Sequence, residues 1–170
     1  MRRLSALAVL AVVGIVVPLT ASPERGSVAI AKELGEALSG RQLSAIAAKD
    51  PDTPGRYIAA LNFPEVQLLV VSASYTDPAV LDDAIARKDY QTVYAALQGP
   101  NTRQGRVFFQ DMGADGLRVD GSGSVDVMYE QGTDQTLFDG NRKAKEKFAK
   151  AETTYERLLS VLLAQAKGAS

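Results

Sequence analysis

The sequence predicts an α+β fold, in which an antiparallel sheet is flanked by helices and a long amphipathic helix ends the chain. Apolar residues recur at helical spacing in residues 27–39 and again in residues 141–166. Between them lie short apolar runs separated by clusters of Gly, Pro, Asn and Asp, a pattern typical of strands and tight turns. Most joins are too short for the helical crossovers of a parallel sheet, which favours antiparallel pairing.

Residues 1–22 have the pattern of an export signal, which leaves residues 23–170 as a single domain. Two arginines precede an uncharged run that ends at Leu19, and small residues around Ala21 offer a cleavage site. A second small-x-small site lies at residues 29–31. The alternative is an uncleaved membrane anchor, although the run is shorter than the roughly 20 residues of a spanning helix. We therefore expect a periplasmic or secreted protein that meets the membrane only if the signal stays attached.

The domain is expected to begin with helices. Residues 27–39 place their apolar side chains on one face, and Gly40 is suited to end that helix. Residues 42–48 are expected to form a second, short helical stretch. The cluster of prolines, aspartates and glycine in residues 50–55 then predicts a loop.

Two strands and two helices are expected next. Residues 56–61 form the first strand and residues 66–75 the second, whose apolar side chains fall on both faces. A strand that is apolar on both faces is buried on both, so we expect this second strand at the centre of the sheet. Asp77 followed by Pro78 favours a helix start. The apolar phase slips around residues 87–89, which predicts two consecutive helices.

Three or four strands and the final helix complete the expected order. Residues 105–112 form one strand, which residues 117–119 extend or pair with. Residues 135–138 return as the second arm of a hairpin. Asn141 is then expected to cap the helix that runs to about residue 166.

The first arm of that hairpin, residues 124–130, alternates between apolar and polar side chains. Such alternation is typical of a strand with one buried face. We expect Val127 and Tyr129 to face the core, and Asp126 and Glu130 to face solvent.

The chain has no histidine and no cysteine, which removes many kinds of catalytic and metal site. A Ser-His-Asp triad and a histidine general base both need histidine. Thiolate zinc sites, redox pairs and cysteine nucleophiles need cysteine. The formal net charge is −1 and no basic surface of domain size is evident, so nucleic-acid binding is not expected.

Carboxylates remain available for chemistry. An acidic stretch contains Asp111, Asp115, Asp120, Asp126, Glu130, Asp134 and Asp139. Calcium prefers oxygen ligands, but this spacing lacks the density of a calcium-binding loop. The alternative is a set of solvated turns and the outer face of a strand. A hydrolase that uses carboxylates alone is a further hypothesis, although no specific pair stands out.

Basic residues crowd the start of the final helix: Arg142, Lys143, Lys145, Lys147 and Lys150. Cations at this end of a helix oppose its dipole. One interpretation is contact with anionic lipid headgroups or with an acidic partner. The other is a solvated face that the nearby acidic stretch balances.

The predicted central strand ends in hydroxyl-bearing side chains, Ser72, Ser74 and Tyr75. Binding sites are common at strand ends, so these three are the candidate ligand- or cofactor-binding residues. The alternative is a polar strand end that leads into a helix cap. The sequence predicts no catalytic residue and no metal ligand.

Residues 47–52 (Ala-Ala-Lys-Asp-Pro-Asp), 55–61 and 66–75 resemble the opening of the FMN-binding split-barrel proteins, the pyridoxamine-phosphate-oxidase-like group. The similarity covers residues 42–112. It implies a small split barrel, FMN as cofactor, and a homodimer with the cofactor at its interface. That family holds the flavin phosphate with Arg or Lys near the strand end. Here residues 72–85 contain no basic residue, so no binding residue is carried over.

The leading hypothesis is an exported, non-enzymatic domain that binds a small molecule or a protein partner of the cell envelope, without a cofactor. The chain is also similar to exported bacterial proteins of unassigned function, which implies a location and no activity. The alternative is a flavin-binding split-barrel oxidoreductase. Proteins loaded with a cofactor generally fold before export, and Arg2 and Arg3 lack the rest of a twin-arginine signal.

Overall fold

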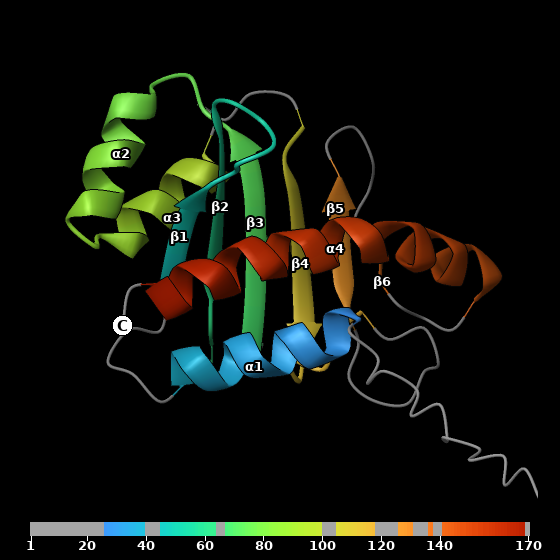
Figure 1. Cartoon of the computed structure of the whole chain (residues 1–170). Helices are drawn as coiled ribbons and strands as arrows, with labels where there is room; N and C mark the ends of the chain where they lie inside the picture. The colour runs from blue at the N-terminus through green and yellow to red at the C-terminus, as the bar shows by residue number, and fades with distance from the viewer. Residues whose placement is uncertain are drawn as a thin grey trace, which may run out of the picture.

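The computed structural model describes residues 26–39, 45–63, 67–99, 105–117, 126–130, 136–137 and 141–168 of the chain. These residues form the elements drawn in Figure 1. The helices are α1 (Ser27–Ser39), α2 (Pro78–Ala86), α3 (Tyr90–Gln98) and α4 (Arg142–Gly168). The strands are β1 (Ala45–Lys49), β2 (Arg56–Leu61), β3 (Gln67–Ser74), β4 (Val107–Met112), β5 (Val127–Glu130) and β6 (Thr136–Leu137).

The strands form one open, antiparallel sheet in which spatial order follows chain order, from β1 at one edge to β6 at the other. Each strand therefore pairs with its neighbours along the chain, and α2 and α3 interrupt this sequence between β3 and β4. The register places Ala59 opposite Val71 and Val71 opposite Phe108, so rows of side chains cross the sheet. The predicted α+β class, with an antiparallel sheet, flanking helices and a long final helix, is confirmed.

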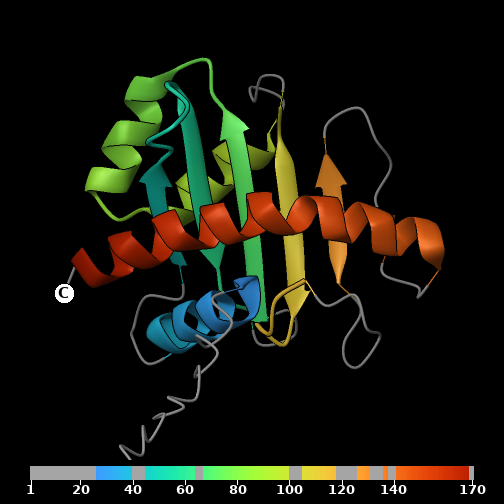
Figure 2. The same ribbon diagram turned by 45° about the vertical axis from the view of Figure 1, so that its right-hand side comes forward.

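Helices cover both faces of the sheet (Figures 1 and 2). α1 and α4 lie side by side across one face. α3 packs on the opposite face of β1, β2 and β3, and α2 packs against α3. The sheet therefore separates two hydrophobic cores.

The larger core lies between the sheet and the helices α1 and α4. Phe109, Phe148 and Tyr155 are fully buried there, and the ring centroids of Phe109 and Tyr155 are 4.9 Å apart. Burying a large apolar side chain contributes roughly 1.5–3 kcal/mol. The predicted apolar stripe of α4 is confirmed, since its members are all buried: Phe148, Ala151, Tyr155, Leu158, Leu159, Leu162 and Leu163.

The second core lies beneath α2 and α3, where Leu81, Val93 and Leu97 are fully buried. Strand β3 contributes to both cores, because Val70 belongs to the first and Val71 to the second, and neither is exposed. This confirms the prediction of a central strand that is buried on both sides.

The prediction of a helical stretch over residues 42–48 is wrong where the structure describes it. Residues 45–49 form β1, which pairs with β2 and places Ala47 opposite Ala59; residues 42–44 lie outside the described part. Alanine favours helices, but here small side chains let helices pack on both faces of an edge strand. Tertiary packing therefore overrides the local preference.

The predicted in-and-out phase of residues 124–130 is wrong at Asp126 and only partly met at Tyr129, whereas Val127 is buried and Glu130 is exposed as expected; residues 124–125 lie outside the described part. Asp126 is 1% exposed and Met128 belongs to the core beneath α4, whereas Tyr129 is half-buried and its ring stacks on Phe108. The backbone N–H of Met112 donates to Oδ1 of Asp126 at 3.1 Å, so a partner is available to this buried carboxylate. The polarity of the side chains in this strand therefore does not indicate which of its faces is buried.

The predicted helix starts are confirmed. α2 begins at Pro78 directly after Asp77, although the Asp77 side chain makes no capping bond. Asp89 Oδ1 accepts a 3.1 Å hydrogen bond from the N–H of Thr92 at the start of α3. Asn141 Oδ1 accepts a 2.9 Å bond from an N–H of the first turn of α4. The phase slip in the sequence thus marks the break between α2 and α3.

Several predicted features lie outside the described residues: the export signal over residues 1–22, the cap at Gly40 and the strand residues 118–119. Leu117 is described, and it is buried without belonging to a strand. None of the described helices combines the length and the apolar character that crossing a lipid bilayer requires.

Candidate functional site

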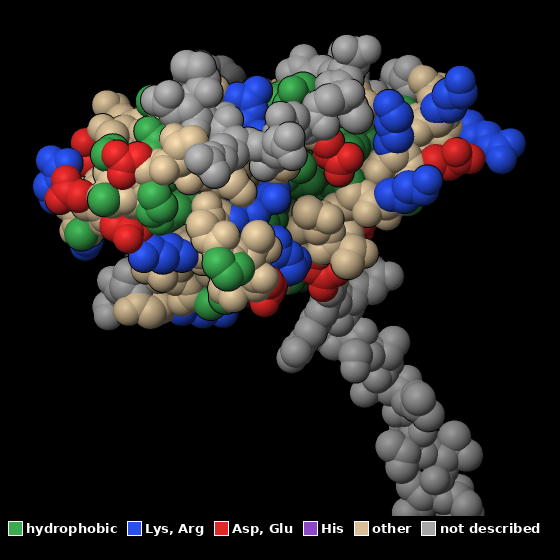
Figure 3. All heavy atoms as spheres, turned by 90° about the horizontal axis from the view of Figure 1, so that it is seen from above, with side chains coloured by type: hydrophobic (Ala, Val, Ile, Leu, Met, Phe, Trp, Pro, Cys, Tyr) green, Lys and Arg blue, Asp and Glu red, His purple; other side chains and the backbone are tan. Residues whose placement is uncertain are grey.

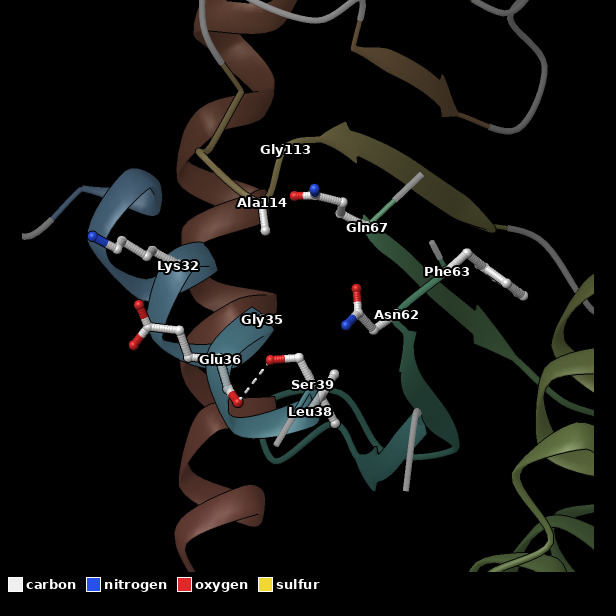
Figure 4. Close-up of a pocket in the computed structure, with 10 residues that line it drawn as sticks. All are labelled: Lys32, Gly35, Glu36, Leu38, Ser39, Asn62, Phe63, Gln67, Gly113 and Ala114. Atoms are coloured by element: carbon white, nitrogen blue, oxygen red, sulfur yellow. Dashed lines mark hydrogen bonds between the residues drawn. The ribbon is translucent and has the colours of Figure 1, made fainter. Parts of the chain in front are cut away.

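A cavity of about 550 Å³ opens at one end of the sheet, between α1 and the strand ends (Figure 4). We call it the amide pocket because the carboxamides of Asn62 and Gln67 face its interior. Small-molecule sites usually enclose roughly 300–1,000 Å³. The residues that line it are Lys32, Gly35, Glu36, Leu38, Ser39, Asn62, Phe63, Gln67, Gly113 and Ala114.

The strand order explains why these residues meet. Asn62 and Phe63 follow the end of β2, and Gln67 begins β3, so the connection between two antiparallel strands holds both amides at one end of the sheet. Gly113 and Ala114 follow β4, the next strand, which ends at the same side. α1 crosses this end of the sheet and closes the pocket on its other side.

The backbone of the amide pocket is strained at two positions. Gln67 has φ 63° and Ala114 has φ 52°, both in the left-handed region. This region is unfavourable for residues with a Cβ atom. Elsewhere in the described residues, Lys88 between α2 and α3 is the other such case. Strain of this kind persists where the surrounding structure enforces it, and it is concentrated at binding sites.

Gly35 allows α1 to approach the turn after β4. A Cβ atom added at Gly35 would lie 3.0 Å from the Cβ of Ala114, closer than side chains normally pack. A larger residue at position 35 would therefore push α1 away from the sheet and occupy the inner wall of the amide pocket.

The two carboxamides are available to a ligand. Neither makes a hydrogen bond within the described part of the chain. Asn62 is half-buried and Gln67 is exposed. Each amide offers two N–H donors and a carbonyl acceptor, so together they suit a ligand that both donates and accepts.

No charged group points toward these amides in Figure 4. The ammonium group of Lys32 and the carboxylate of Glu36 extend away from them, so their stems rather than their charges line the cavity. The hydroxyl of Ser39 donates to the carbonyl oxygen of Glu36 at 3.1 Å. As far as the described residues line it, the amide pocket is therefore a neutral, hydrogen-bonding site with an apolar border that includes Leu38.

A second cavity, of about 870 Å³, lies along the outer edge of β1, between α2 and the C-terminal half of α4. Asp82 stands in its wall and accepts hydrogen bonds from Lys49 Nζ at 2.9 Å and from the Tyr57 hydroxyl at 3.1 Å. Burial, together with the nearby Asp82 carboxylate, raises the pKa of Tyr57 to about 12. The phenol therefore stays protonated near neutral pH and is a poor general base.

A third cavity, of about 230 Å³, lies on the face of the sheet beside α3. The guanidinium of Arg106 lies 5.4 Å from the ring centroid of Tyr129, which stacks on Phe108 at 5.5 Å. Arg106 also donates to the carbonyl oxygen of Gln98 at 2.7 Å. Arg106 and Phe108, which line this cavity, are thus already engaged with the ring of Tyr129 beside it.

The structure does not bring Ser72, Ser74 and Tyr75 into one pocket. Ser72 is fully buried and accepts a 2.7 Å hydrogen bond from Nε of Arg56. Ser74 lies on the same face by strand alternation. Tyr75 packs against the core beneath α2 and α3. None of the three lines any of the cavities described above.

A charged network near the end of β3 was missed by sequence reasoning. Arg157 on α4 donates to both carboxylate oxygens of Asp50, at 2.8 and 2.9 Å, and to Asp52 at 3.2 Å. Burial raises the pKa of Asp50, but these hydrogen bonds outweigh it and the net pKa is lowered. Arg56 donates to the carbonyl oxygen of Gly105. Because acceptors of the chain itself engage both guanidinium groups, the network ties α4 to the loop after β1.

Two acids of the predicted acidic stretch are buried rather than solvated. Asp111 is unexposed, and it accepts hydrogen bonds from the Tyr155 hydroxyl at 2.8 Å and from the N–H groups of Asp115 and Gly116 at 3.0 Å each. Burial raises the pKa of Asp111, and these bonds offset the rise in part. The carboxylate of Asp111 therefore closes the turn after β4, and that of Asp126 accepts from Met112 at the end of β4.

Among the described residues, no group of three acidic side chains is arranged to hold a metal ion. Asp120, Asp134 and Asp139 lie outside the described part. In comparisons with known proteins, no protein-family model matches this chain, and no curated protein or solved structure matches it significantly. The geometry of the chain itself is therefore the basis for assigning a function.

Proposed function

We propose that this protein is an exported, non-enzymatic binding protein whose amide pocket takes a small neutral polar ligand of monosaccharide size. One observation carries the proposal: the carboxamides of Asn62 and Gln67, which have no partner among the described residues, face the same cavity of about 550 Å³. Sugars fit this chemistry because each hydroxyl both donates and accepts hydrogen bonds. Leu38 and Phe63 provide apolar contact at the border of the same cavity.

The lining also supports binding rather than catalysis. The chain has no histidine or cysteine. Hydrolysis of a glycosidic bond typically needs two carboxyl groups that flank it. Among the described lining residues Glu36 is the one acid, and its carboxylate points away from the amides.

The start of α1 supports one of the two export cleavage sites. Ser27 and Ala31 are fully buried, and the N–H of Ser27 donates to Glu152 Oε1 at 3.3 Å. Cleavage at residues 29–31 would remove the first turn of α1 and these contacts. The proposal therefore includes cleavage near Ala21, upstream of the helix.

The test uses the protein as isolated from expressing cells, with the same N-terminus in every variant. N-acetylglucosamine, which carries hydroxyls and an amide, is titrated while side-chain NH₂ resonances are followed by NMR. We expect the signals of Asn62 and Gln67 to shift together with one binding curve. Asn62→Ala and Gln67→Ala should each abolish saturable binding of N-acetylglucosamine. Gln91→Ala, which replaces an exposed glutamine on α3, should leave that binding unchanged.

Glucose and glutamate separate the ligand classes. Shifts of both amide signals with glucose agree with a neutral sugar-sized ligand. Shifts of these signals with glutamate alone would contradict the neutral class, and no shift with any probe would reject the pocket as a sugar site. The isolated protein should also be colourless and take up no added FMN, because flavin absorbance would support the oxidoreductase alternative instead.

A further inference from the structure

The first turns of α4 carry a concentration of positive charge that the contacts of the described fold engage only in part and that the amide pocket does not use. We call the exposed residues Arg142, Lys143, Lys145, Lys147 and Lys150 the basic tip. Arg142 pairs with Glu146 at 2.9 Å, and Lys147 Nζ donates to Thr136 Oγ1 at 3.2 Å. The side chains of Lys143, Lys145 and Lys150 make no hydrogen bond or ion pair within the described part of the chain.

The position of these charges is unfavourable for the helix itself. The start of a helix carries partial positive charge, so cations there are destabilising and acids are stabilising. α4 has no acid in its first turn, and its cap is the neutral Asn141. Helix stability therefore does not explain the basic tip.

The basic tip also projects from the molecule. The N-terminal part of α4 extends past β5 and β6 at one side of the sheet (Figures 1 and 2). Seen from above in Figure 3, lysine and arginine side chains gather on this projecting end. None of its five residues lines the cavities described above. A convex end of this kind can approach a flat surface.

We infer that the basic tip docks the protein on an anionic lipid surface. Four of its five cations are lysines, which act as point charges and suit a diffuse layer of headgroups. Recognition of a specific acidic protein would favour arginine forks and an apolar anchor. At the basic tip the apolar side chains Ala144 and Phe148 are instead buried, and Phe148 belongs to the core beneath α4. Charge complementarity thus favours the membrane over a protein partner.

The test compares two variants of equal net charge. Lys143→Gln with Lys150→Gln removes two unpartnered cations from one face of α4, seven residues apart. Lys88→Gln with Lys167→Gln removes two exposed lysines elsewhere. Binding is measured by co-sedimentation with vesicles that contain phosphatidylglycerol in phosphatidylcholine, and with pure phosphatidylcholine vesicles.

We expect the wild-type protein to bind the anionic vesicles and to release as salt screens the charges. The basic-tip variant should bind about 25-fold more weakly, or about fivefold for each cation. The control variant should bind as the wild type does. The melting temperatures of both variants should equal that of the wild type. Equal loss in both variants, a preference for neutral vesicles, or binding to polyglutamate without binding to anionic vesicles would overturn the inference. None of these outcomes depends on the amide pocket.

Discussion

The hydroxyl of Tyr155 donates a 2.8 Å hydrogen bond to Oδ2 of Asp111, which joins the middle of α4 to the end of β4 through the core. Both residues are fully buried. The same carboxylate accepts two N–H groups from the turn that follows β4. One side chain therefore shapes that turn, whose residue Ala114 lines the amide pocket, and anchors the helix above it.

Tyr155→Phe should lower the free energy of unfolding by about 1–3 kcal/mol, because it leaves a buried carboxylate with one donor fewer. The measurement is urea denaturation at neutral pH. Tyr129→Phe is the matched control, since that ring is half-buried and no hydrogen bond of its hydroxyl is described. Equal losses in the two variants would show that the Asp111 contact contributes nothing specific.

The pH dependence of stability should differ between Asp50 and Asp111. The pKa of Asp50 is lowered below 3.8 in the folded state, so its stabilising contribution is present above that pH and is lost as the pH falls through the folded pKa. The pKa of Asp111 is raised above 3.8, so its contribution is present at low pH and is lost as the pH rises through the folded pKa. Denaturation of Asp50→Asn and Asp111→Asn from acid to neutral pH measures both effects. The difference in the free energy of unfolding between the wild type and Asp50→Asn should increase as the pH rises. The corresponding difference for Asp111→Asn should decrease as the pH rises. The same pH dependence in both variants would contradict these pKa directions.

Gly116→Ala should destabilise the fold by about 3 kcal/mol, through left-handed strain and a steric clash. Gly116 has φ 85°, and an added Cβ would lie 2.7 Å from the backbone nitrogen of Val28 at the start of α1. Gly55→Ala is the comparison, because Gly55 has φ 76° and no atom within 4 Å of an added Cβ. We expect a loss of about 1–2 kcal/mol there from the backbone alone. Thermal and urea unfolding measure the difference, which should vanish if α1 does not pack as described.

Export processing should produce a chain that begins upstream of α1. Mass analysis of the N-terminus of the exported protein should place the cut near Ala21. A start at Lys32 would contradict this expectation, because Ser27 and Ala31 are buried in the fold. An intact Met1 in the membrane fraction would instead support the anchor alternative.

Much of the fold could be predicted from local pattern. The helix over residues 27–39, the strand over residues 56–61 and the stripe of α4 follow from periodicity that packing then reinforces. Prediction failed at β1, where alanines suit either structure and pairing with β2 decides. It failed again at Asp126, because a buried carboxylate with a donor looks like a solvated one in the sequence.

The candidate site was less predictable, since its residues meet through the sheet rather than along the chain. Asn62 and Gln67 lie in a connection that carries no motif, and Ala114 joins them because β4 pairs with β3. Arg157 and Asp50 are 107 positions apart, and no local pattern links them. The place of Ser72 at a strand end favours a binding role, but in the fold its side chain is buried and its hydroxyl accepts a hydrogen bond from Arg56.

The side-by-side packing of α1 and α4 constrains the order in which this protein can fold. Ser27 and Glu152 are in contact although 125 positions separate them. The helix α4, which is synthesised after α1 and the strands, contributes 8 of the 22 described buried residues of one core. Contacts between segments so far apart in the sequence form slowly, so we expect the nascent chain to remain loosely packed until α4 has been synthesised. If the chain is exported as proposed, this delay keeps it unfolded while it passes through a translocation pore. It would then fold after it has crossed the membrane.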